Sequence, residues 1–497
     1  MRYFLILFCL LLVACDKAGD SAEFDADPVT GPDLFSADIG DVDFPVSCST
    51  GAAEHTQRGL ALLHHMMYEE ARLLFGMAAN IDSECAMAYW GQAMTWVHPL
   101  WPDRPKPAEL AIGRDLLNRA EAVNPPTERE AGYVAAARAY FDSQAGDTEL
   151  DRLRRFDRAW SEVAQQNPND LEARALAALA HIATASFEDK SYAIQQRAAE
   201  MAQSVLDEMP DHPGAHHYFI HAFDNPAHAE AALPVADRYG VLTPVVPHAT
   251  HMMTHIYTRL GEWDKSVEWN QKSADAAWEI CTESGEISSH YTHALDYLVY
   301  AQLQMGADKA ALAAVVDATS VEGPFSDLNP VANAYALAAM PARYALERRD
   351  WEQAASLAPR PSEFPWAPEH APYEAITYFA RALGQAHLGD TEAARQSIAK
   401  LRSLGELTRE SDPYWAKQVD IQINAATAWV LEAEGDSAGA LESMRLAAQL
   451  EDSTEKSPVT PGEVLPAQEL LGDLHLAQGS PEAALEAYRK SLDRSPR

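Results

Sequence analysis

Two short stretches, His217-Tyr-Phe-Ile-His221 and His251-Met-Met-Thr-His255, decide the fold of this chain. Within each stretch the histidines have i, i+4 spacing, which places both imidazoles on one face of a single helix. The second pair repeats the first at a constant offset, since 251 − 217 = 34 and 255 − 221 = 34. A fixed period of this size indicates a repeat array, in which equal positions of successive units lie side by side. The sequence therefore predicts two neighbouring helices that present their histidines at matching heights.

This offset equals the period of the tetratricopeptide repeat (TPR), a helix–turn–helix unit. The chain resembles TPR proteins at the positions where the two helices of a repeat pack closely, which hold Ala71, Ala232, Ala354, Ala394, Ala440 and Ala484. It also resembles them at the turn between the helices, which holds Gly261, Gly306, Gly389, Gly435 and Gly479. The resemblance implies an all-α, TPR-like α-solenoid of about ten helix–turn–helix pairs.

The size and charge of the chain narrow its class. A chain of 497 residues is too long for one compact core and favours several domains or a repeat array. The formal net charge of −36 argues against nucleic acid or an anionic lipid surface as the main partner.

The amino terminus is typical of a lipoprotein signal peptide at residues 1–14. Arg2 precedes an apolar run that is too short to cross a bilayer. The run ends in Leu12-Val13-Ala14-Cys15, which resembles a bacterial lipobox. This resemblance implies that Cys15 carries a lipid and anchors a cell-envelope lipoprotein, facing the periplasm or the cell surface. The alternative is an ordinary secretory signal with an incidental cysteine. The sequence does not distinguish the inner from the outer membrane.

The remainder of the chain divides by composition. Residues 15–50 are acidic with no helical period, which predicts a lipidated flexible tether. Residues 51–310 are predicted to form an N-terminal TPR solenoid with a histidine-rich groove, and residues 311–497 C-terminal TPR repeats. The proline-rich segments 359–372 and 458–466 are predicted to be loops between repeats.

Three cysteines remain in the folded part, so at least one is unpaired. Cys85 lies inside a helical apolar pattern, which favours a buried free thiol there. Any pairing of Cys48 with Cys85 or Cys281 stays open, as does the oligomeric state.

In the TPR family, defined positions of the first helix line the concave groove of the solenoid. Mapped onto this sequence, three successive repeats, which are predicted to start at Pro213, Pro247 and Thr292, carry polar side chains at those positions: His217, His221 and Asp224; His248, His251, His255 and Arg259; and His293, Asp296 and Tyr300. His64 and His98, separated by the same period, map to the same face nearer the amino terminus.

The paired histidines predict a transition-metal site. Imidazoles from neighbouring helices can converge on one ion, because helix axes lie about 8–10 Å apart and zinc–nitrogen distances are about 2.0–2.1 Å. Nitrogen ligands suit zinc or copper better than calcium or magnesium. The predicted ligands are His217, His221, His251, His255 and His293. The other groove residues, Asp224, His248, Asp296, Arg259, Tyr300, His64 and His98, are predicted to support the site. The alternative is that these histidines only form hydrogen bonds, as single groove histidines commonly do.

The sequence names no reaction. His251-Met-Met-Thr-His255 lacks the glutamate of a His-Glu-x-x-His metalloprotease, and no phosphate-binding or nucleophile motif stands in a convincing context. The catalytic residues are unknown, and whether the protein is an enzyme stays open.

The chain also resembles a histidine-rich group of bacterial TPR proteins over about residues 52–310. The shared blocks are Cys85-Ala-Met-Ala-Tyr-Trp-Gly91, His98-Pro-Leu-Trp101, His217-Tyr-Phe-Ile-His-Ala-Phe-Asp224, His251-Met-Met-Thr-His-Ile256 with Arg259-Leu-Gly261, and Leu295-Asp-Tyr-Leu-Val-Tyr300. Where the group usually has His-Met-Pro-Ser-His, this chain has Met253 and Thr254, which puts the start of that helix in doubt. The resemblance implies a site without naming its function. The hypotheses are a lipid-anchored metal-binding TPR protein, a scaffold for a protein or peptide ligand without metal, and a metal-dependent hydrolase or oxidase.

Overall fold

The computed structural model describes residues 34, 37–101, 105–142, 146–362, 364–366 and 368–494. Within these residues the chain forms the α-helices α1–α22 and one short 3-10 helix, and no β-strand. The prediction of an all-α fold is confirmed. The predicted signal peptide and Cys15 lie outside the described residues. Among the described helices, none is long and apolar enough to cross a membrane.

The helices follow one another along the chain, and the connections between them vary in length. The first eleven are α1 (Thr50–His64), α2 (Tyr68–Ile81), α3 (Ala86–Met94), α4 (Pro107–Ala122), α5 (Glu128–Phe141), α6 (Glu149–Gln166), α7 (Leu171–Ile182), α8 (Ala193–Leu206), α9 (Pro213–Phe223), α10 (Ala229–Leu242) and α11 (Pro247–Leu260). The others are α12 (Trp263–Ser284), α13 (Ser289–Gln304), α14 (Asp308–Thr319), α15 (Pro330–Glu347), α16 (Trp351–Ser356), η1 (Pro368–His370), α17 (Ala371–His387), α18 (Thr391–Arg409), α19 (Pro413–Ala433), α20 (Ser437–Asp452), α21 (Ala467–Ala477) and α22 (Pro481–Arg494).

Each odd-numbered helix packs against the even-numbered helix that follows it, from α1 with α2 to α21 with α22. The alanines predicted at the close contacts are all 0% exposed, because only a small side chain fits there: Ala71, Ala232, Ala354, Ala394, Ala440 and Ala484. The predicted turn glycines adopt φ values between 68° and 87°, which glycine reaches without a Cβ penalty. The described residues therefore form a TPR-like α-solenoid of eleven pairs, against the predicted ten or so.

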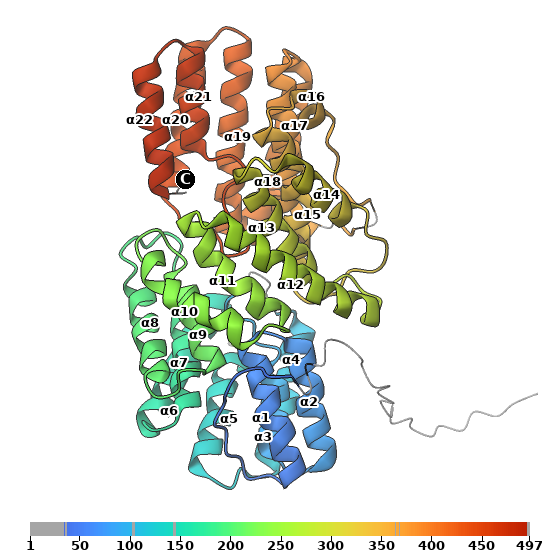
Figure 1. The fold of residues 1–497 in the computed structure, drawn as a ribbon, viewed down its shortest axis with the longest axis vertical. Coiled ribbons are helices and arrows are strands. Elements are labelled where there is room, and N and C mark those ends of the chain that lie inside the picture. Colours follow the sequence, from blue (N-terminus) through green and yellow to red (C-terminus); the bar gives the residue numbers. More distant parts are fainter. Residues whose placement is uncertain are drawn as a thin grey trace, which may run out of the picture. The chain divides into compact units, whose positions relative to one another are not determined.

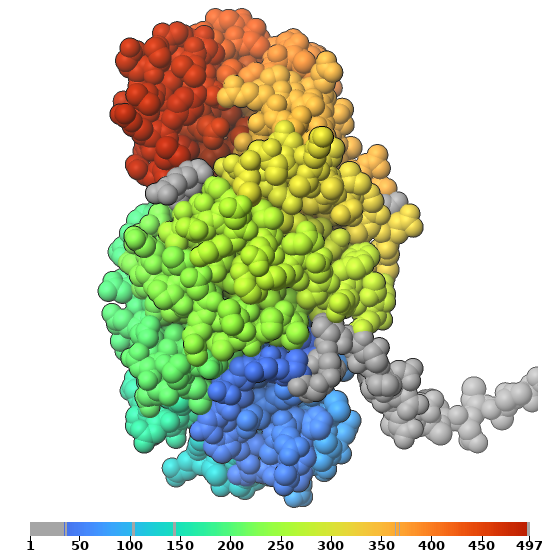
Figure 2. Space-filling view, in the orientation of Figure 1, coloured from blue at the N-terminus to red at the C-terminus, as the bar shows by residue number. Residues whose placement is uncertain are grey.

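Helices α9, α11 and α13 are the first helices of three successive pairs, and they contact each other in turn (Figure 1). Pro213 and Pro247 occupy the first turn of α9 and α11, where a missing N–H costs nothing. Both helices begin where the repeat register predicts, whereas α13 begins at Ser289, ahead of the predicted start at Thr292. Figure 2 shows the same face in space-filling form, on which the segment containing α11 and α13 appears in green to yellow-green.

Residues 37–49 differ from the predicted flexible tether. Ile39 and Phe44 are buried, with 3% and 1% of their surface exposed. The main chain bonds to three helices: Ile39 O lies 2.9 Å from His65 Nε2, Asp43 N–H donates to Glu172 (3.0 Å), and Ser47 N–H donates to Glu130 (2.6 Å). We call residues 37–49 the N-terminal strap. The many acidic residues suggested a solvated segment, but apolar residues between them fix the strap to α1, α5 and α7.

A disulfide fixes the end of the strap. Cys48 and Cys85 are bonded to each other, and the free cysteine of the described residues is Cys281, which is buried. The prediction that Cys85 is a free thiol is therefore wrong. The apolar pattern indicated burial correctly but could not reveal that the strap brings Cys48 to the start of α3.

Replacing both Cys48 and Cys85 by serine is expected to lower the free energy of unfolding by about 3–4 kcal/mol, the chain-entropy value for a loop of this length. The two cysteines are separated by 37 residues. Urea denaturation followed by circular dichroism measures the change. The matched control is Cys281→Ser, which keeps the disulfide, and an equal loss in this control would contradict the prediction.

The segment between α20 and α21, here called the 453–466 loop, reaches back to the amino-terminal half. Glu455 N–H donates to Phe187 O (2.7 Å), and Lys190 donates to Thr454 O (2.6 Å). Tyr297 on α13 donates to the carbonyl oxygens of Pro458 (3.0 Å) and Thr460 (3.1 Å). The segment 458–466 is thus a loop between repeats, as predicted. The predicted boundary at residues 310 and 311 falls inside α14, and the described residues belong to one unit.

Candidate metal centre on three neighbouring helices

Six histidines from α9, α11 and α13 gather in two groups of three. In each group, every histidine offers one ring nitrogen, and these three nitrogens all lie within 4.8 Å of one another. The first triad is His217, His221 and His248, and the second triad is His251, His255 and His293. Each triad combines an i, i+4 pair on one helix with a histidine near the start of the next first helix. The two predicted pairs therefore do not share a single set of four nitrogens, because each pair is completed by the helix that follows it.

The first triad leaves several ring nitrogens without a protein partner. The His217 ring lies 4.9 Å from that of His221 and 5.0 Å from that of His248, between centroids. His217 Nδ1–H donates to His64 O at 2.6 Å, which fixes the proton on Nδ1. No described residue bonds to Nε2 of His217, to Nε2 of His221 or to either nitrogen of His248. Buried nitrogens of this kind normally have a partner.

In the second triad, two of the ring nitrogens lie close together. His251 and His255 face each other with their Nε2 atoms 3.0 Å apart. The His293 ring lies 4.4 Å from that of His251, and no described residue bonds to its Nδ1.

The partners of the Nδ1 atoms determine the tautomers of the facing rings. Asn270 donates its amide N–H to Ser266 O (2.8 Å), so its oxygen faces His251 Nδ1 at 2.8 Å and requires a proton there. His255 Nδ1 lies 2.9 Å from the Asp224 carboxylate, which can only accept a hydrogen bond, so this Nδ1 carries a proton as well. In the neutral rings both Nε2 atoms are then lone-pair acceptors that point at each other. Two acceptors at this distance repel unless a cation or an additional proton lies between them.

Burial keeps the imidazoles neutral. It lowers the pKa of His217 to about 3, and holds the pKa values of His221, His251 and His293 well below their usual range with help from neighbouring histidines. Burial likewise lowers the pKa of His290 to about 4. Neutral imidazole is the form that binds metal ions. The cluster is therefore in a ligand-competent state at neutral pH.

Asp224 holds His255 in place and is not available as a base. Its two oxygens accept from His255, Arg259 (2.8 Å) and Lys456 (3.1 Å). Burial alone would raise the pKa of Asp224, but Lys456, Arg259 and His255 hold it well below its usual range. Burial lowers the pKa of Lys456 to about 8, with Asp224 opposing the shift. A carboxylate that fixes the Nδ1–H of a ligand histidine is a common support of metal sites.

A cavity of about 30 Å³ lies between the triads. Its lining includes His221 and His248 of the first triad, His255 and His293 of the second, and Pro458 and Val459 of the 453–466 loop. A site for one water needs about 10–15 Å³. The space therefore suffices for a small ion or a water molecule beside the rings. Trp101 and His290, whose ring centroids are 5.8 Å apart, also line it.

A third buried group, His64 with Glu172 and His212, is satisfied by hydrogen bonds. His212 Nδ1 accepts the Ala215 N–H, so its Nε2–H donates to Glu172 (3.2 Å). His64 Nε2 donates to the same carboxylate oxygen (2.8 Å), while its Nδ1 accepts from Tyr218 (2.8 Å). Every ring nitrogen in this group thus has a partner. The group joins α1, α7 and α9 and holds the strap through Glu172, so we assign it a structural role.

Glu172→Gln is expected to lower the free energy of unfolding at pH 7 by about 1.5–3 kcal/mol, the usual contribution of a hydrogen bond to a charged group. Burial raises the pKa of Glu172, but His212 and His64 outweigh it and depress the pKa far below its ordinary value of 4.5. The depressed pKa makes the carboxylate stabilising above pH 4.5, and this contribution is lost as the pH falls below that value.

Urea denaturation of the wild type and Glu172→Gln at pH 7, 5 and 4 measures the difference. The difference in the free energy of unfolding between the two proteins is expected to become smaller as the pH falls. A difference that becomes larger as the pH falls would contradict the structural role of the carboxylate.

Four of the predicted groove residues do not join the triads. Asp296 forms an ion pair with Arg343, and Tyr300 lies beside the same guanidinium at 5.1 Å, away from the histidines. His64 belongs to the group described above. His98 packs on Tyr68 and Trp101, with ring centroids 4.3 Å and 5.4 Å away. The repeat register predicted one face for all of these side chains, but it could not show which neighbour each side chain meets.

Other residues at the site escaped the sequence analysis. Tyr297 packs against His251 and His255, with ring centroids 4.7 Å and 4.9 Å away, at the place predicted for Tyr300. His290 lies 5.2 Å from His248 and belongs to the part of α13 that precedes the predicted helix start. Lys456 comes from a distant loop and had no local signal. His248 was predicted to support the site and not to bind the ion. It occupies the same repeat position as the predicted ligand His293, and this match was the available sign that it completes a triad.

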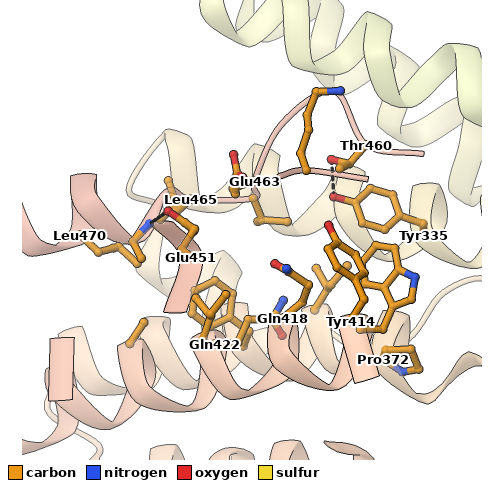
Figure 3. A pocket seen from close by; sticks show the side chains of 18 residues that line it. Tyr335, Pro372, Tyr414, Gln418, Gln422, Glu451, Thr460, Glu463, Leu465 and Leu470 are labelled. Carbon is orange, nitrogen blue, oxygen red and sulfur yellow. Dashed lines mark hydrogen bonds between the residues drawn. The ribbon is translucent and has the colours of Figure 1, made fainter. Parts of the chain in front are cut away.

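A second cavity, of about 50 Å³, lies in the carboxy-terminal repeats next to the 453–466 loop. Figure 3 shows Tyr335 bonded to Thr460 of the loop, with Tyr414, Gln418 and Gln422 nearby. Ligand pockets for small molecules usually enclose about 300–1,000 Å³. This cavity is therefore too small to hold a peptide in the conformation seen here.

No protein-family model matches the chain, and no curated protein matches it. Among solved structures, the Cut9–Hcn1 hetero-tetramer of the APC/C is 12% identical over 91% of this chain and 76% of that chain, with a TM-score of 0.38. A monomeric IFIT1 mutant with Gppp-AAAA is 15% identical over 92% and 93%, with a TM-score of 0.39. Yeast Tom70 is 12% identical over 90% and 92%, with a TM-score of 0.33. The TPR-like assignment rests on the helix pairs described above.

Proposed function

We propose that this protein binds a transition-metal ion through its buried histidines, as a lipid-anchored TPR-like protein of the cell envelope. The observation that carries the proposal is the pair of facing Nε2 atoms of His251 and His255. Their Nδ1 protons are committed to Asn270 and Asp224, so the two lone pairs meet 3.0 Å apart. A metal ion between them turns this repulsion into coordination.

The spacing suits a first-row transition metal. Two nitrogens bound at about 2.0–2.1 Å, with an angle of about 90–110° at the ion, are about 2.9–3.4 Å apart. The observed 3.0 Å lies within this range. His293 supplies a third nitrogen from α13, and a set of imidazoles favours zinc or copper over calcium or magnesium. Asn270 and Asp224 fix the rings from behind, as the supporting groups of metal sites do.

Metal-free protein is expected to bind about one zinc ion per chain, measured by elemental analysis after gel filtration. The double variant His217→Ala/His251→Ala is expected to lose this zinc, because it removes a nitrogen from each triad. Its circular dichroism spectrum should remain helical, because the helix pairs do not depend on the ion.

His181→Ala is the matched control. It removes a half-buried histidine on α7 that bonds to Asp157, outside both triads. Full zinc occupancy in the double variant would overturn the proposed function.

The proposed envelope location has a separate basis. The lipobox-like sequence at Cys15 implies a lipid anchor, and the Cys48–Cys85 disulfide is typical of proteins outside the reducing cytosol. Zinc or copper is therefore bound on the periplasmic or exterior side of the membrane in this proposal.

Cys15→Ser is expected to abolish incorporation of labelled palmitate and to move the protein from the membrane fraction to the soluble fraction. Cys9→Ser, within the same apolar run, should leave both readouts unchanged. Palmitate incorporation that persists in Cys15→Ser would disprove the anchor.

A protein-interaction scaffold is the second candidate, since helical-repeat solenoids present extended concave surfaces that bind partners. The observation in its favour is the buried Gln422 Oε1 in the lining of the second cavity, which no described residue satisfies. A peptide that bound there would have to widen the cavity. Capture of a partner that is unaffected by metal removal, together with absence of metal from the native protein, would favour this candidate.

A further inference from the structure

The two triads are copies of one pattern. In each, two histidines one turn apart on a first helix meet a histidine from the beginning of the next first helix. The first triad uses α9 and α11, and the second uses α11 and α13. Because the same helix pairing repeats along a solenoid, the same side-chain geometry repeats with it. Each triad is thus a complete three-nitrogen set.

The triads adjoin each other closely. The rings of His221 and His255 are 5.7 Å apart, and those of His248 and His251 are 6.1 Å apart, between centroids. Histidines from both triads line the same 30 Å³ cavity. Unpartnered nitrogens occur in both triads, on His217, His221 and His248 of the first and on His293 of the second. Two ions bound by these sets would face each other across one shared space.

The charge around this space selects against highly charged ions. Among the described residues, none that lines the cavity carries a carboxylate. Asp224 approaches the site through its bond to His255, and it already faces Arg259 and Lys456. The side chains of these three residues carry a net positive charge. Two divalent ions would place four further positive charges in a buried site without an anionic ligand, which is costly in a medium of low dielectric constant.

We propose that the two triads form a dinuclear copper site that holds two cuprous ions, one bound by His217, His221 and His248 and the other by His251, His255 and His293. The inference rests on the proposed metal-binding function and adds the number of ions and their oxidation state. Copper binds well to imidazole. Two cuprous ions add only two positive charges and fit the three nitrogens that each triad offers.

Anaerobic titration of the full chain with cuprous ion, in competition with a coloured cuprous chelator, tests the proposal. The wild type is expected to withhold two copper ions per chain from the chelator, that is, to keep them bound to the protein. His248→Ala and His293→Ala each remove the third nitrogen of one triad and should each withhold one ion. The His181→Ala control should withhold two.

A titration with zinc provides a second readout. A first zinc ion is expected to bind, and a second at least tenfold more weakly, because the second divalent charge has no anion to offset it. Two zinc ions of equal affinity would overturn the assigned preference for a monovalent ion.

The outcomes distinguish failure of the proposed metal-binding function from failure of the dinuclear copper site. If the wild type binds neither copper nor zinc, the proposed function fails. If the wild type withholds one cuprous ion, or if His248→Ala still withholds two, metal binding stands and the dinuclear site is disproved. Should an alanine variant unfold, His248→Gln and His293→Gln keep the bulk of the side chain, and the same one-ion result is expected from folded protein.

Discussion

The mutual approach of two lone pairs is the constraint around which this structure is arranged. His251 and His255 cannot rotate away, because Asn270 holds one ring and Asp224 the other. Asp224 is in turn held by Arg259 of the same helix as the two rings and by Lys456 of the distant 453–466 loop. A polar arrangement with this many fixed partners is expensive to bury. Its presence in the interior of a helical-repeat protein indicates a function beyond packing.

The solenoid explains why a histidine triad occurs twice. Helix α11 contributes its early histidine, His248, to the first triad and its later pair, His251 and His255, to the second, so it belongs to both. The longer α12 places α13 further along the chain than the regular repeat period would, yet His293 still meets His251 at 4.4 Å between ring centroids. Packing of helix against helix, and not the length of the connection, fixes the relative height of the rings. The third buried group, at Glu172, shows the contrasting case in which every nitrogen has a hydrogen-bond partner.

Much of the fold was predictable because its causes are local. The alanines and turn glycines recur with the helix pairs, and the helix starts at Pro213 and Pro247 follow from proline's preference for the first turn. The face on which the histidines lie followed from their spacing. Their grouping into triads did not, because it depends on which neighbouring helix each ring meets. Asp296 illustrates this. Its position on α13 suggested that it lies beside the histidines, but it forms an ion pair with Arg343 of α15 instead.

The features that could not be predicted share a long separation in sequence. The strap looked like a solvated tether because of its acidic residues, and only the surfaces of α5 and α7 explain its fixed course. The 453–466 loop has a further consequence for how the chain becomes functional. All six imidazoles are present once α13 has formed. Lys456, which restrains Asp224, and Pro458 and Val459, which line the cavity, are made only after α20. A nascent or truncated chain that ends after α13 therefore carries the imidazoles without the loop residues that line the cavity and restrain Asp224.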